Sequence, residues 1–343
     1  MKPLRILGWL AAGLLLAAPM GCNRGPSKTK VAFVSNNAES FWSIAEAGTR
    51  KAAAEEDVEV LFRKPAQGDA ALQKEHIDTV LSQGIKALAV SVIDPDNQAA
   101  YLNEIAEKVP LLTQDNDAPN TKRKCYIGTD NYGAGKAVGK LIQEIMPDGG
   151  IVVLFVGDLK PLNAQQRRQG VLDQLAGVKD AKGEPGDDGD KYGKFAVYRT
   201  YLDQPEGPQK AKENAVDAIT KLGNKKQPIC MIGLWAYNPP AILSAVKDKG
   251  KEGQIKIVGF DEDTATLQGI ADDIIYATVV QQPFQFGYQA VKMMAALARG
   301  DNSKIPADGI RYVPHRIITK EGGKDRVPVE KFRKELEELL NGS

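Results

Sequence analysis

The sequence has few cysteines, few histidines and almost no net charge. Its 343 residues include 3 cysteines and 2 histidines, His76 and His315, and their spacing does not match a zinc site. The 45 Lys and Arg residues nearly balance the 44 Asp and Glu residues, leaving a formal charge of +1. The chain lacks a basic run of the kind that marks a nucleic-acid-binding surface. The composition therefore predicts that the protein binds neither metal nor nucleic acid.

Catalytic and cofactor-binding motifs are also missing. The segment DNYGAGKAVG, residues 130–139, has the look of a phosphate-binding loop, but an aspartate stands where the first glycine belongs and an alanine where the hydroxyl belongs. The third glycine of a dinucleotide fingerprint is a valine. We interpret the segment as a glycine-rich helix start. Since there is also no G-x-S-x-G elbow, and neither histidine lies near a serine or cysteine at a strand end, we predict a protein that is not an enzyme and needs no cofactor.

The N-terminal segment 1–22, MKPLRILGWLAAGLLLAAPMGC, reads as an export signal. Two basic residues precede about 13 apolar ones, fewer than the roughly 20 that a membrane-spanning helix needs, which argues against an uncleaved membrane anchor. The Gly21-Cys22 ending resembles the bacterial lipoprotein signal, which implies that Cys22 is lipidated and that residues 23–29 form a tether. Pro19 stands where such signals usually carry Leu, so secretion with cleavage nearby remains the alternative.

The other two cysteines, Cys125 and Cys230, lie in the apolar runs CYIGT and ICMIGLW. A free cysteine in such a run usually packs as a small hydrophobic side chain. A disulfide between them is the alternative in an oxidising compartment, but the two runs belong to different predicted lobes. We therefore expect two buried thiols.

Beyond residue 30, apolar runs alternate with helical patterns, as in βα units. The runs do not alternate internally, which is typical of parallel strands covered on both faces. Because the chain exceeds the length that one core usually supports, we predict an α/β protein of two Rossmann-like lobes, each with a parallel sheet. The predicted strands are VAFVS, VEVLF, IKALAVSV, PLLTQ and CYIGT in one group, and IVVLFVG, FAVYRTY, ICMIGLW, IKIVGFD and IIYATVV in the other.

Two further segments stand apart from this pattern. Residues 178–194 are rich in Gly, Asp and Lys; their DDGD lacks the ligand spacing and closing glutamate of a calcium loop, so we predict a solvated surface loop. The C-terminal KFRKELEELL reads as an amphipathic helix that packs on the second lobe, with a partner contact as the alternative.

Polar and aromatic side chains gather where the predicted strands end. Ligands of open parallel sheets bind beyond these carboxyl ends. Carboxylates and amides form hydrogen bonds with neighbouring hydroxyls, and a guanidinium donates hydrogen bonds from a fixed planar arrangement. Aromatic faces pack against the C–H side of a sugar ring. These side chains together suit a neutral polyol. Taken singly, the aspartates could instead cap turns or helices, and the two rings near residue 41 could belong to the core. The candidates are Glu39, Phe41, Trp42, Asp115, Asn116, Asp130, Asn131, Arg167, Trp235, Asp261 and Gln281.

Four blocks in order resemble the type I periplasmic sugar-binding proteins of bacterial ABC transporters, including the ribose-binding proteins, and the likeness covers nearly all of residues 30–320. The blocks are VAFVSNNAESFW, CYIGTDNYGAGKAVG, IVGFDEDTATLQGI and ATVVQQPFQFGYQAV. The resemblance implies lobes joined by a three-strand hinge, with residues 30–130 plus 282–310 in the N-terminal lobe and 131–281 plus 311–343 in the C-terminal lobe. It also implies crossings near Asp130, Gln281 and Ile310.

The resemblance further implies how the pocket works. Phe41 and Trp42 would hold a sugar ring, and its hydroxyls would bond to Asp115, Arg167, Asp261 and Gln281. Three positions depart from ribose-binding members, which tend to have Asn, Arg and Asn where this chain has Glu39, Asn116 and Trp235.

The resemblance implies an exported, monomeric binding protein in the periplasm or cell envelope that delivers a monosaccharide or similar polyol to an ABC permease. A ligand-sensing receptor subunit of a membrane signalling protein is the alternative. Repressors that share this fold are disfavoured by the export signal and by the lack of a helix-turn-helix segment before Val31.

Overall fold

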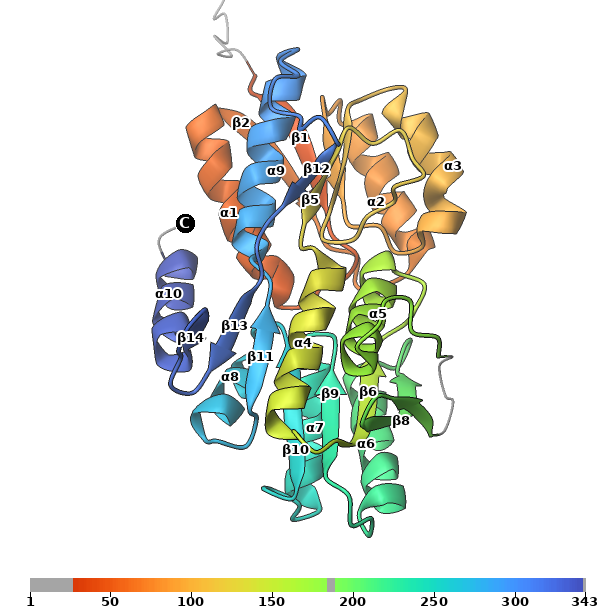
Figure 1. Ribbon diagram of the computed structural model, residues 1–343. Helices are drawn as coiled ribbons and strands as arrows, with labels where there is room; N and C mark the ends of the chain where they lie inside the picture. The colour runs from red at the N-terminus through yellow and green to blue at the C-terminus, as the bar shows by residue number, and fades with distance from the viewer. Residues whose placement is uncertain (1–26, 184–188, 342–343) are drawn as a thin grey trace, which may run out of the picture.

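The computed structural model describes residues 27–183 and 189–341. The predicted export signal, the lipidation site Cys22 and most of the tether lie outside the described residues, as does part of the 178–194 loop. Two parallel-stranded sheets, each with its own helices, form two lobes that are stacked in Figure 1. This confirms the predicted α/β architecture.

The first lobe is built on a six-stranded sheet in the order β12-β5-β4-β3-β1-β2, and all its strand pairs are parallel. Its strands are β1 (Thr29–Val34), β2 (Val58–Arg63), β3 (Leu88–Val90), β4 (Leu111–Gln114), β5 (Cys125–Gly128) and β12 (Ile310–Tyr312). Its helices are α1 (Phe41–Glu56), α2 (Ala70–Ser82), α3 (Pro95–Ala106) and α9 (Pro283–Ala298).

The second lobe is built on an eight-stranded sheet in the order β14-β13-β11-β10-β9-β6-β8-β7, with an antiparallel pair toward each edge. Its strands are β6 (Gly150–Val156), β7 (Asp190–Tyr192), β8 (Phe195–Leu202), β9 (Ile229–Gly233), β10 (Ile255–Phe260), β11 (Ala277–Val280), β13 (Arg316–Thr319) and β14 (Arg326–Pro328). Its helices are α4 (Asn131–Ile145), α5 (Leu162–Ala176), α6 (Pro208–Leu222), α7 (Asn238–Asp248), α8 (Thr264–Ala271) and α10 (Val329–Asn341).

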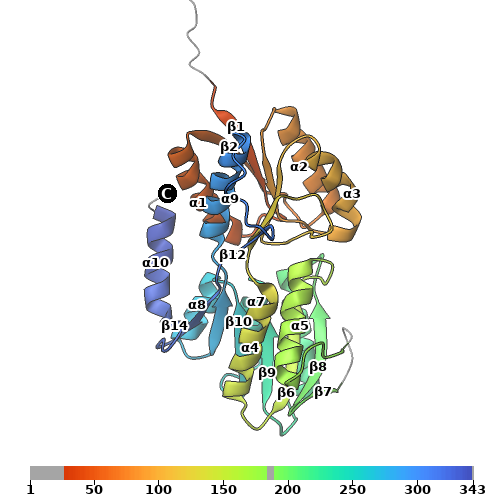
Figure 2. The same cartoon turned by 45° about the horizontal axis from the view of Figure 1, so that its top comes forward.

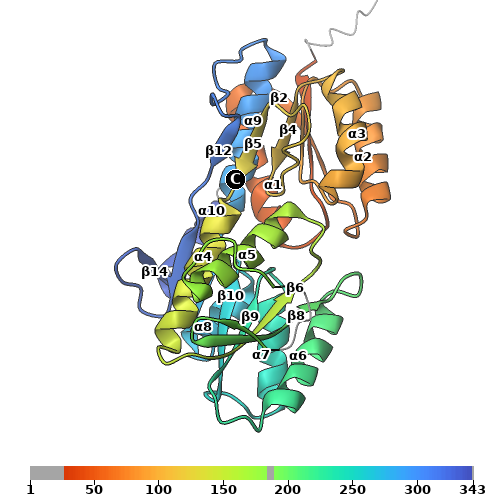
Figure 3. The same cartoon turned by 45° about the vertical axis from the view of Figure 1, so that its right-hand side comes forward.

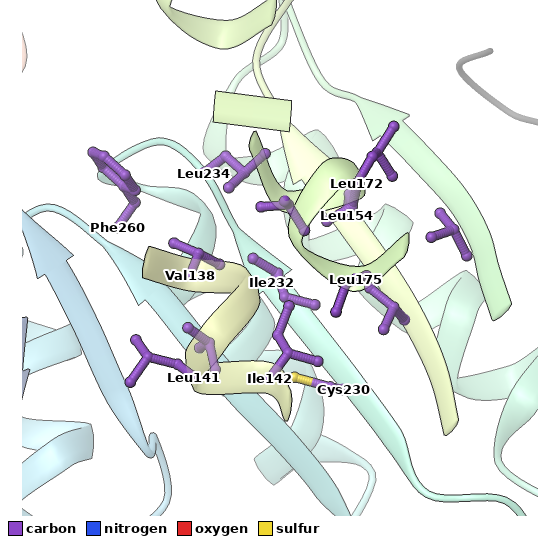
Figure 4. Packing of buried hydrophobic residues seen from close by; sticks show 14 of the residues in the cluster. Val138, Leu141, Ile142, Leu154, Leu172, Leu175, Cys230, Ile232, Leu234 and Phe260 are labelled. Carbon is purple, nitrogen blue, oxygen red and sulfur yellow. The ribbon is translucent and has the colours of Figure 1, made fainter. Parts of the chain in front are cut away.

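Each sheet is covered by helices on both faces, because successive strand residues point to opposite sides. In β1, Val31 and Phe33 face α1 and α9, whereas Ala32 and Val34 face α2 and α3, the pair to the right of the upper sheet in Figure 3. The second sheet is layered in the same way, with α4 and α5 on one face and α6 and α7 on the other. Figure 4 shows side chains of α4 and α5 meeting those of β6 and β9 in this core.

The chain crosses between the sheets after β5, after β11 and after β12. The first two crossings fall at Asp130 and Gln281, where the hinge was expected. The third comes slightly later than Ile310, because Arg311 and Tyr312 still pair with β5. The lobe boundaries themselves stay a prediction.

The short strands β7, β12, β13 and β14 were not predicted as strands. Each has three or four residues and lies at or near a sheet edge, where apolar runs are not required. All ten predicted strands are present in the described residues.

Helix α10 lies alongside both lobes in Figure 2. Val329 and Phe332 are buried in the core of the second lobe, as the amphipathic pattern predicted. One turn further on, Leu336 packs on a cluster that includes Ile44 and Phe284 of the first lobe. The helix therefore bridges the lobes on the side of the hinge.

Cys125 and Cys230 are both buried and free. They lie in β5 and β9, in different sheets, which agrees with the expectation of two separate thiols. Burial raises the pKa of Cys125 to about 11, so this thiol stays protonated at neutral pH.

Candidate functional site

A central cavity lies between the lobes at the carboxyl ends of the strands, where the sequence placed its candidates. It encloses about 460 Å³, part of which is open to solvent. Eight of the eleven candidates named from the sequence line it. The lining residues are Asn36, Asn37, Glu39, Phe41, Trp42, Asp115, Asn163, Arg167, Trp235, Ala236, Tyr237, Asp261 and Gln281.

Asp115 and Asp261, which follow β4 and β10, reach the cavity from opposite lobes through the same backbone geometry. Both have left-handed backbones, with φ of 58° and 66°, a conformation that costs energy for residues other than glycine and often occurs at functional sites. In each case a hydroxyl from the next strand holds the carbonyl: Tyr126 donates to Asp115 at 2.9 Å and Thr278 to Asp261 at 2.8 Å. The neighbouring strand thus stabilises the turn that aims each carboxylate.

Arg167 is buried at 2% exposure on α5, and its guanidinium is held from three sides. Nε donates to Asn131 Oδ1 at 2.9 Å, Nη1 donates to the Leu234 carbonyl at 3.0 Å, and the guanidinium carbon lies 3.9 Å from the ring centre of Phe260. Nη2 has no hydrogen-bonding partner within the described residues. Since Arg167 lines the cavity, this nitrogen is the donor left for a ligand.

The close packing of α4 on α5 sets the position of Arg167. A Cβ at Gly135 would lie 2.2 Å from the Arg167 carbonyl oxygen, and one at Gly170 would lie 2.3 Å from the Tyr132 carbonyl oxygen. Both positions require glycine at this separation. The glycines of the 130–139 segment therefore serve helix packing, and Asp130 caps α4 by accepting from the Gly133 N–H at 3.0 Å.

Burial dominates the electrostatics of the three acidic groups in the cavity. It raises the pKa of Asp115 to about 6, although the Arg167 charge and a hydrogen bond from Ser91 act in the opposite direction. The pKa of Asp261 is raised for the same reason, against the opposing effects of Arg167 and Gln281. Glu39 also has a raised pKa, first through burial and then through the charge of Asp263. The cavity therefore holds carboxylates that are desolvated and close to one positive charge.

Phe41 and Trp42 belong to both the core and the cavity. They are 8% and 2% exposed, pack edge to face at 5.0 Å, and join the hydrophobic cluster beneath α1 and α9. Trp42 Nε1 donates to Asn36 Oδ1 at 3.2 Å. The two interpretations that the sequence left open, core and pocket wall, are therefore compatible.

The second lobe contributes its own aromatic pair, Trp235 and Tyr237, which meet edge to face at 6.1 Å. The Tyr237 hydroxyl donates to the buried carboxylate of Asp203 and accepts from Gln204 Nε2 at 2.9 Å. Burial raises the pKa of Asp203 to about 7. Both lobes thus present aromatic rings. Trp42 Nε1 and the Tyr237 hydroxyl are bonded to the protein, whereas Trp235 Nε1 has no hydrogen-bonding partner among the described residues.

Three candidates do not line the cavity: Asp130, which caps α4, Asn131, which accepts from Arg167, and Asn116. Asn116 is fully buried, and its amide nitrogen donates to the Val92 carbonyl. Its Oδ1 accepts from the Asn163 backbone N–H of α5 at 3.1 Å. Asn116 therefore links the lobes behind the cavity wall in this structure.

Five lining residues were not among the predicted ligands. The residues are Asn36, Asn37, Asn163, Ala236 and Tyr237. The asparagine pair directly after the first strand was visible as a turn signal, and Tyr237 follows Trp235 in the same loop. No signal in the sequence singles out Asn163.

Within residues 27–183 and 189–341, no group of three or more His, Cys, Asp or Glu side chains could hold a metal ion. The same residues include no helix long and apolar enough to cross a membrane.

Comparison with known proteins identifies the family. The model of the periplasmic binding protein domain matches residues 31–302, and the chain belongs to this family. The chain is similar to a ribose import binding protein of Haemophilus influenzae, with 23% identity over 87% of this chain and 96% of the relative. It is also similar to the D-allose-binding periplasmic protein of Escherichia coli, with 22% identity over 78% of this chain and 83% of that protein.

Solved structures share the fold. An ABC transporter solute-binding protein from Burkholderia graminis, in complex with D-arabinose, has a TM-score of 0.77 and 21% identity, covering 86% of this chain and 96% of its own. The XylFII–LytSN complex has a matching chain with a TM-score of 0.74 and 22% identity, covering 86% of this chain and 99% of its own. The fold is therefore that of the type I periplasmic binding proteins.

Proposed function

We propose that the protein is an extracytoplasmic solute-binding protein that captures a monosaccharide or similar polyol and delivers it to an ABC permease. The observation that carries this proposal is the convergence of carboxylates, one guanidinium and aromatic rings from both lobes on a single cavity. The relatives support it, since their names describe ribose and D-allose binding proteins and an ABC transporter solute-binding protein with bound D-arabinose. These are binding proteins rather than enzymes, and we propose that this chain performs no catalysis.

In this proposal each wall has its own part. Phe41, Trp42 and Trp235 pack against the C–H faces of the sugar ring. The carboxylates of Asp115 and Asp261 accept hydrogen bonds from the sugar hydroxyls, and Arg167 Nη2 donates hydrogen bonds to the oxygens of these hydroxyls. Glu39 and Gln281 complete the polar contacts, and Asn116 acts indirectly through Asn163.

Ligand-driven closure follows from the placement of these groups. Only a ligand that contacts both lobes favours the closed arrangement over the open one. Asp115 is in the first lobe, whereas Arg167 and Asp261 are in the second. The three crossings after β5, β11 and β12 would act as the hinge, and the closed form would be the one that the permease recognises.

The cell envelope is the place where such a protein works. We propose that residues 1–22 direct export, that Cys22 carries a lipid anchor with residues 23–29 as tether, and that the protein is a monomer. Labelling with a radioactive or clickable fatty acid, compared between the natural chain and a Cys22→Ala variant, tests the anchor. Equal label in both would leave secretion with cleavage as the remaining alternative.

Sensing is the second candidate function. One similar structure, XylFII–LytSN, is a complex of two proteins, so a member of this fold can present its surface to a partner. In that case the same cavity would bind the sugar and report it to a membrane signalling protein. A neighbouring histidine kinase gene rather than an ABC permease gene would favour this function.

The first experiment is thermal unfolding of the purified, ligand-free protein against pentoses, hexoses, polyols and small amino acids. A ligand with micromolar Kd at millimolar concentration should stabilise the fold by about 4 kcal/mol. A shift in Tm with a sugar supports the proposal. Shifts confined to amino acids, or no shift at all in a cooperatively unfolding sample, would overturn it.

A further inference from the structure

A second and larger space, which we call the outer groove, opens beside the central cavity. It encloses about 1140 Å³, part of it open to solvent, more than twice the volume of the central cavity. Its walls come from both lobes, with residues 36–40 and 66–68 on one side and residues 204–208 on the other. Asn36, Asn37, Glu39 and Trp235 line both spaces. The two spaces therefore adjoin at these four residues.

The chemistry of the outer groove is that of a neutral hydroxylated ligand. Its charged side chains are Glu39, Asp158 and Glu206, and its amides include Gln67 and Gln204. Among the described residues that line it there is no lysine or arginine. Carboxylates accept hydrogen bonds from hydroxyls, and amides both accept and donate them, whereas the three carboxylates would repel a phosphate.

The boundary between the two spaces is held in place by the protein itself. A Cβ at Gly157 would lie 2.0 Å from Trp235 Cζ3, so the indole ring rests directly on the chain at the end of β6. The Glu39 backbone N–H donates to Asn37 Oδ1 at 2.9 Å. Gln204 reaches from the outer groove to the hydroxyl of Tyr237 in the central cavity. A ligand that passes Trp235 would therefore meet a preformed surface, with little ordering required on binding.

We propose that the preferred ligand is a disaccharide or other glycoside, with one ring in the central cavity and the second in the outer groove across Trp235. This inference rests on the proposed sugar-binding function and extends its ligand from one sugar ring to two. The Trp235 ring would contact the linked pair where both spaces meet, and Gln67 and Glu206 would bond the second ring from opposite sides.

The test is calorimetric titration of the purified, ligand-free protein at pH 7. The probes are glucose, galactose and xylose, set against cellobiose, lactose, maltose and xylobiose. We expect at least one disaccharide to bind at least tenfold more tightly than each of its component monosaccharides. The double variant Gln67→Ala/Glu206→Ala should reduce that advantage to less than threefold and leave the monosaccharide affinity unchanged. The matched control is Gln227→Ala/Glu252→Ala, two exposed residues that line neither space.

Each other outcome counts against the inference in a different way. If a monosaccharide binds as tightly as every disaccharide, the outer groove is only the entrance to the cavity, and the proposed function survives alone. If the double variant weakens both ligand types equally, the second ring does not lie in the outer groove. If no sugar of either kind binds, the proposed function fails and this inference fails with it.

Discussion

Asp115 in the first lobe and Asp261 in the second are equivalent in backbone and different in surroundings. Both follow a strand, both have a left-handed backbone, and both have their carbonyl held by a hydroxyl of the adjacent strand. The Asp115 carboxylate accepts from the Ser91 hydroxyl at 2.8 Å, whereas the Asp261 carboxylate accepts from the Gln281 amide at 3.0 Å. The two lobes thus direct a carboxylate into the cavity through the same backbone geometry. They differ in the side chain that donates a hydrogen bond to this carboxylate.

The helix pairs beside the cavity show the same repetition. In the first lobe, α1 and α9 approach so closely that a Cβ at Gly48 would lie 2.0 Å from the Phe284 carbonyl oxygen, and one at Gly287 would lie 2.0 Å from that of Ala45. In the second lobe, Gly135 and Gly170 do the same for α4 and α5. The two helix pairs differ in the side chains that they bring to the cavity. The α1 helix carries the aromatic pair, whereas the α5 helix carries the buried arginine. The α1 helix therefore brings aromatic rings to the first wall and the α5 helix brings a guanidinium to the second, and each wall combines polar and aromatic residues.

Replacing Arg167 should have the largest effect on sugar affinity, because it removes the one guanidinium from the second wall of the cavity. We expect Arg167→Met to weaken sugar binding at pH 7 by at least about 100-fold, because two charge-assisted hydrogen bonds contribute about 1.5–3 kcal/mol each. Calorimetry with the sugar found in the thermal screen measures it. Arg168→Met is the matched control, since Arg168 is buried next door, bonds to Thr200 at 2.9 Å and does not line the cavity. An equal loss in both variants would show that Arg167 acts only through the fold.

The pKa of Asp115 predicts how the first wall responds to pH. Burial raises this pKa from 3.8 to about 6. A sugar hydroxyl that donates to the ionised carboxylate favours the charged form, so the affinity is nearly full at pH 7 and should fall about tenfold between pH 7 and pH 5. In the ligand-free protein, the stability of the fold changes with pH in the opposite direction to the affinity. Protonation of Asp115 between pH 6 and pH 4 removes a buried charge and therefore increases the free energy of unfolding.

Titrations at several pH values with the natural protein and with Asp115→Asn check this prediction. The variant cannot take up the proton, so its affinity should be nearly flat over the range in which the natural protein loses affinity. A variant that keeps the full pH dependence would assign the titration to another group.

The carboxylate of the second wall is tested by Asp261→Ala. We expect binding to weaken by at least about 1 kcal/mol, or fivefold, because the carboxylate accepts charged hydrogen bonds, while the protein still folds. Asp272→Ala, at the exposed end of α8, is the control and should bind as the natural protein does. Unchanged affinity in Asp261→Ala would remove this residue from the site.

The smallest effects on affinity should come from the helix contacts. Gly287→Ala and Gly170→Ala each force a close helix pair apart and should destabilise the fold by about 1–3 kcal/mol. We expect Gly170→Ala also to weaken binding by about threefold because α5 carries Arg167, and Gly287→Ala to weaken it less. Denaturant unfolding and calorimetry on the same samples measure both quantities. The reverse order of affinities would mean that the aromatic wall depends more on its helix contact than the arginine does.

Much of the fold was predictable because buried parallel strands require continuous apolar runs. All ten such runs are strands, and eight of the eleven candidate site residues line one cavity, since parallel strands bring their carboxyl ends to the same edge. Asn116 was misplaced relative to the cavity, because its side chain turns to the Val92 carbonyl and to Asn163. The contact between Asn116 and Asn163 joins residues 47 positions apart, so no local sequence pattern indicates it.

The sequence by itself determined the ten apolar strands, the helix start in residues 130–139 and the residue types that follow the strands, because these depend on local periodicity and on which side chains may be buried. The tertiary structure decided which of these residues meet. It placed Arg167 against Asn131 and Phe260, turned Asn116 away from the cavity, added Tyr237 and Asn163 to its wall, and set an outer groove beside the cavity at Trp235. These contacts depend on how closely helices pack and on how the two lobes face each other, which are distances between segments far apart in the chain.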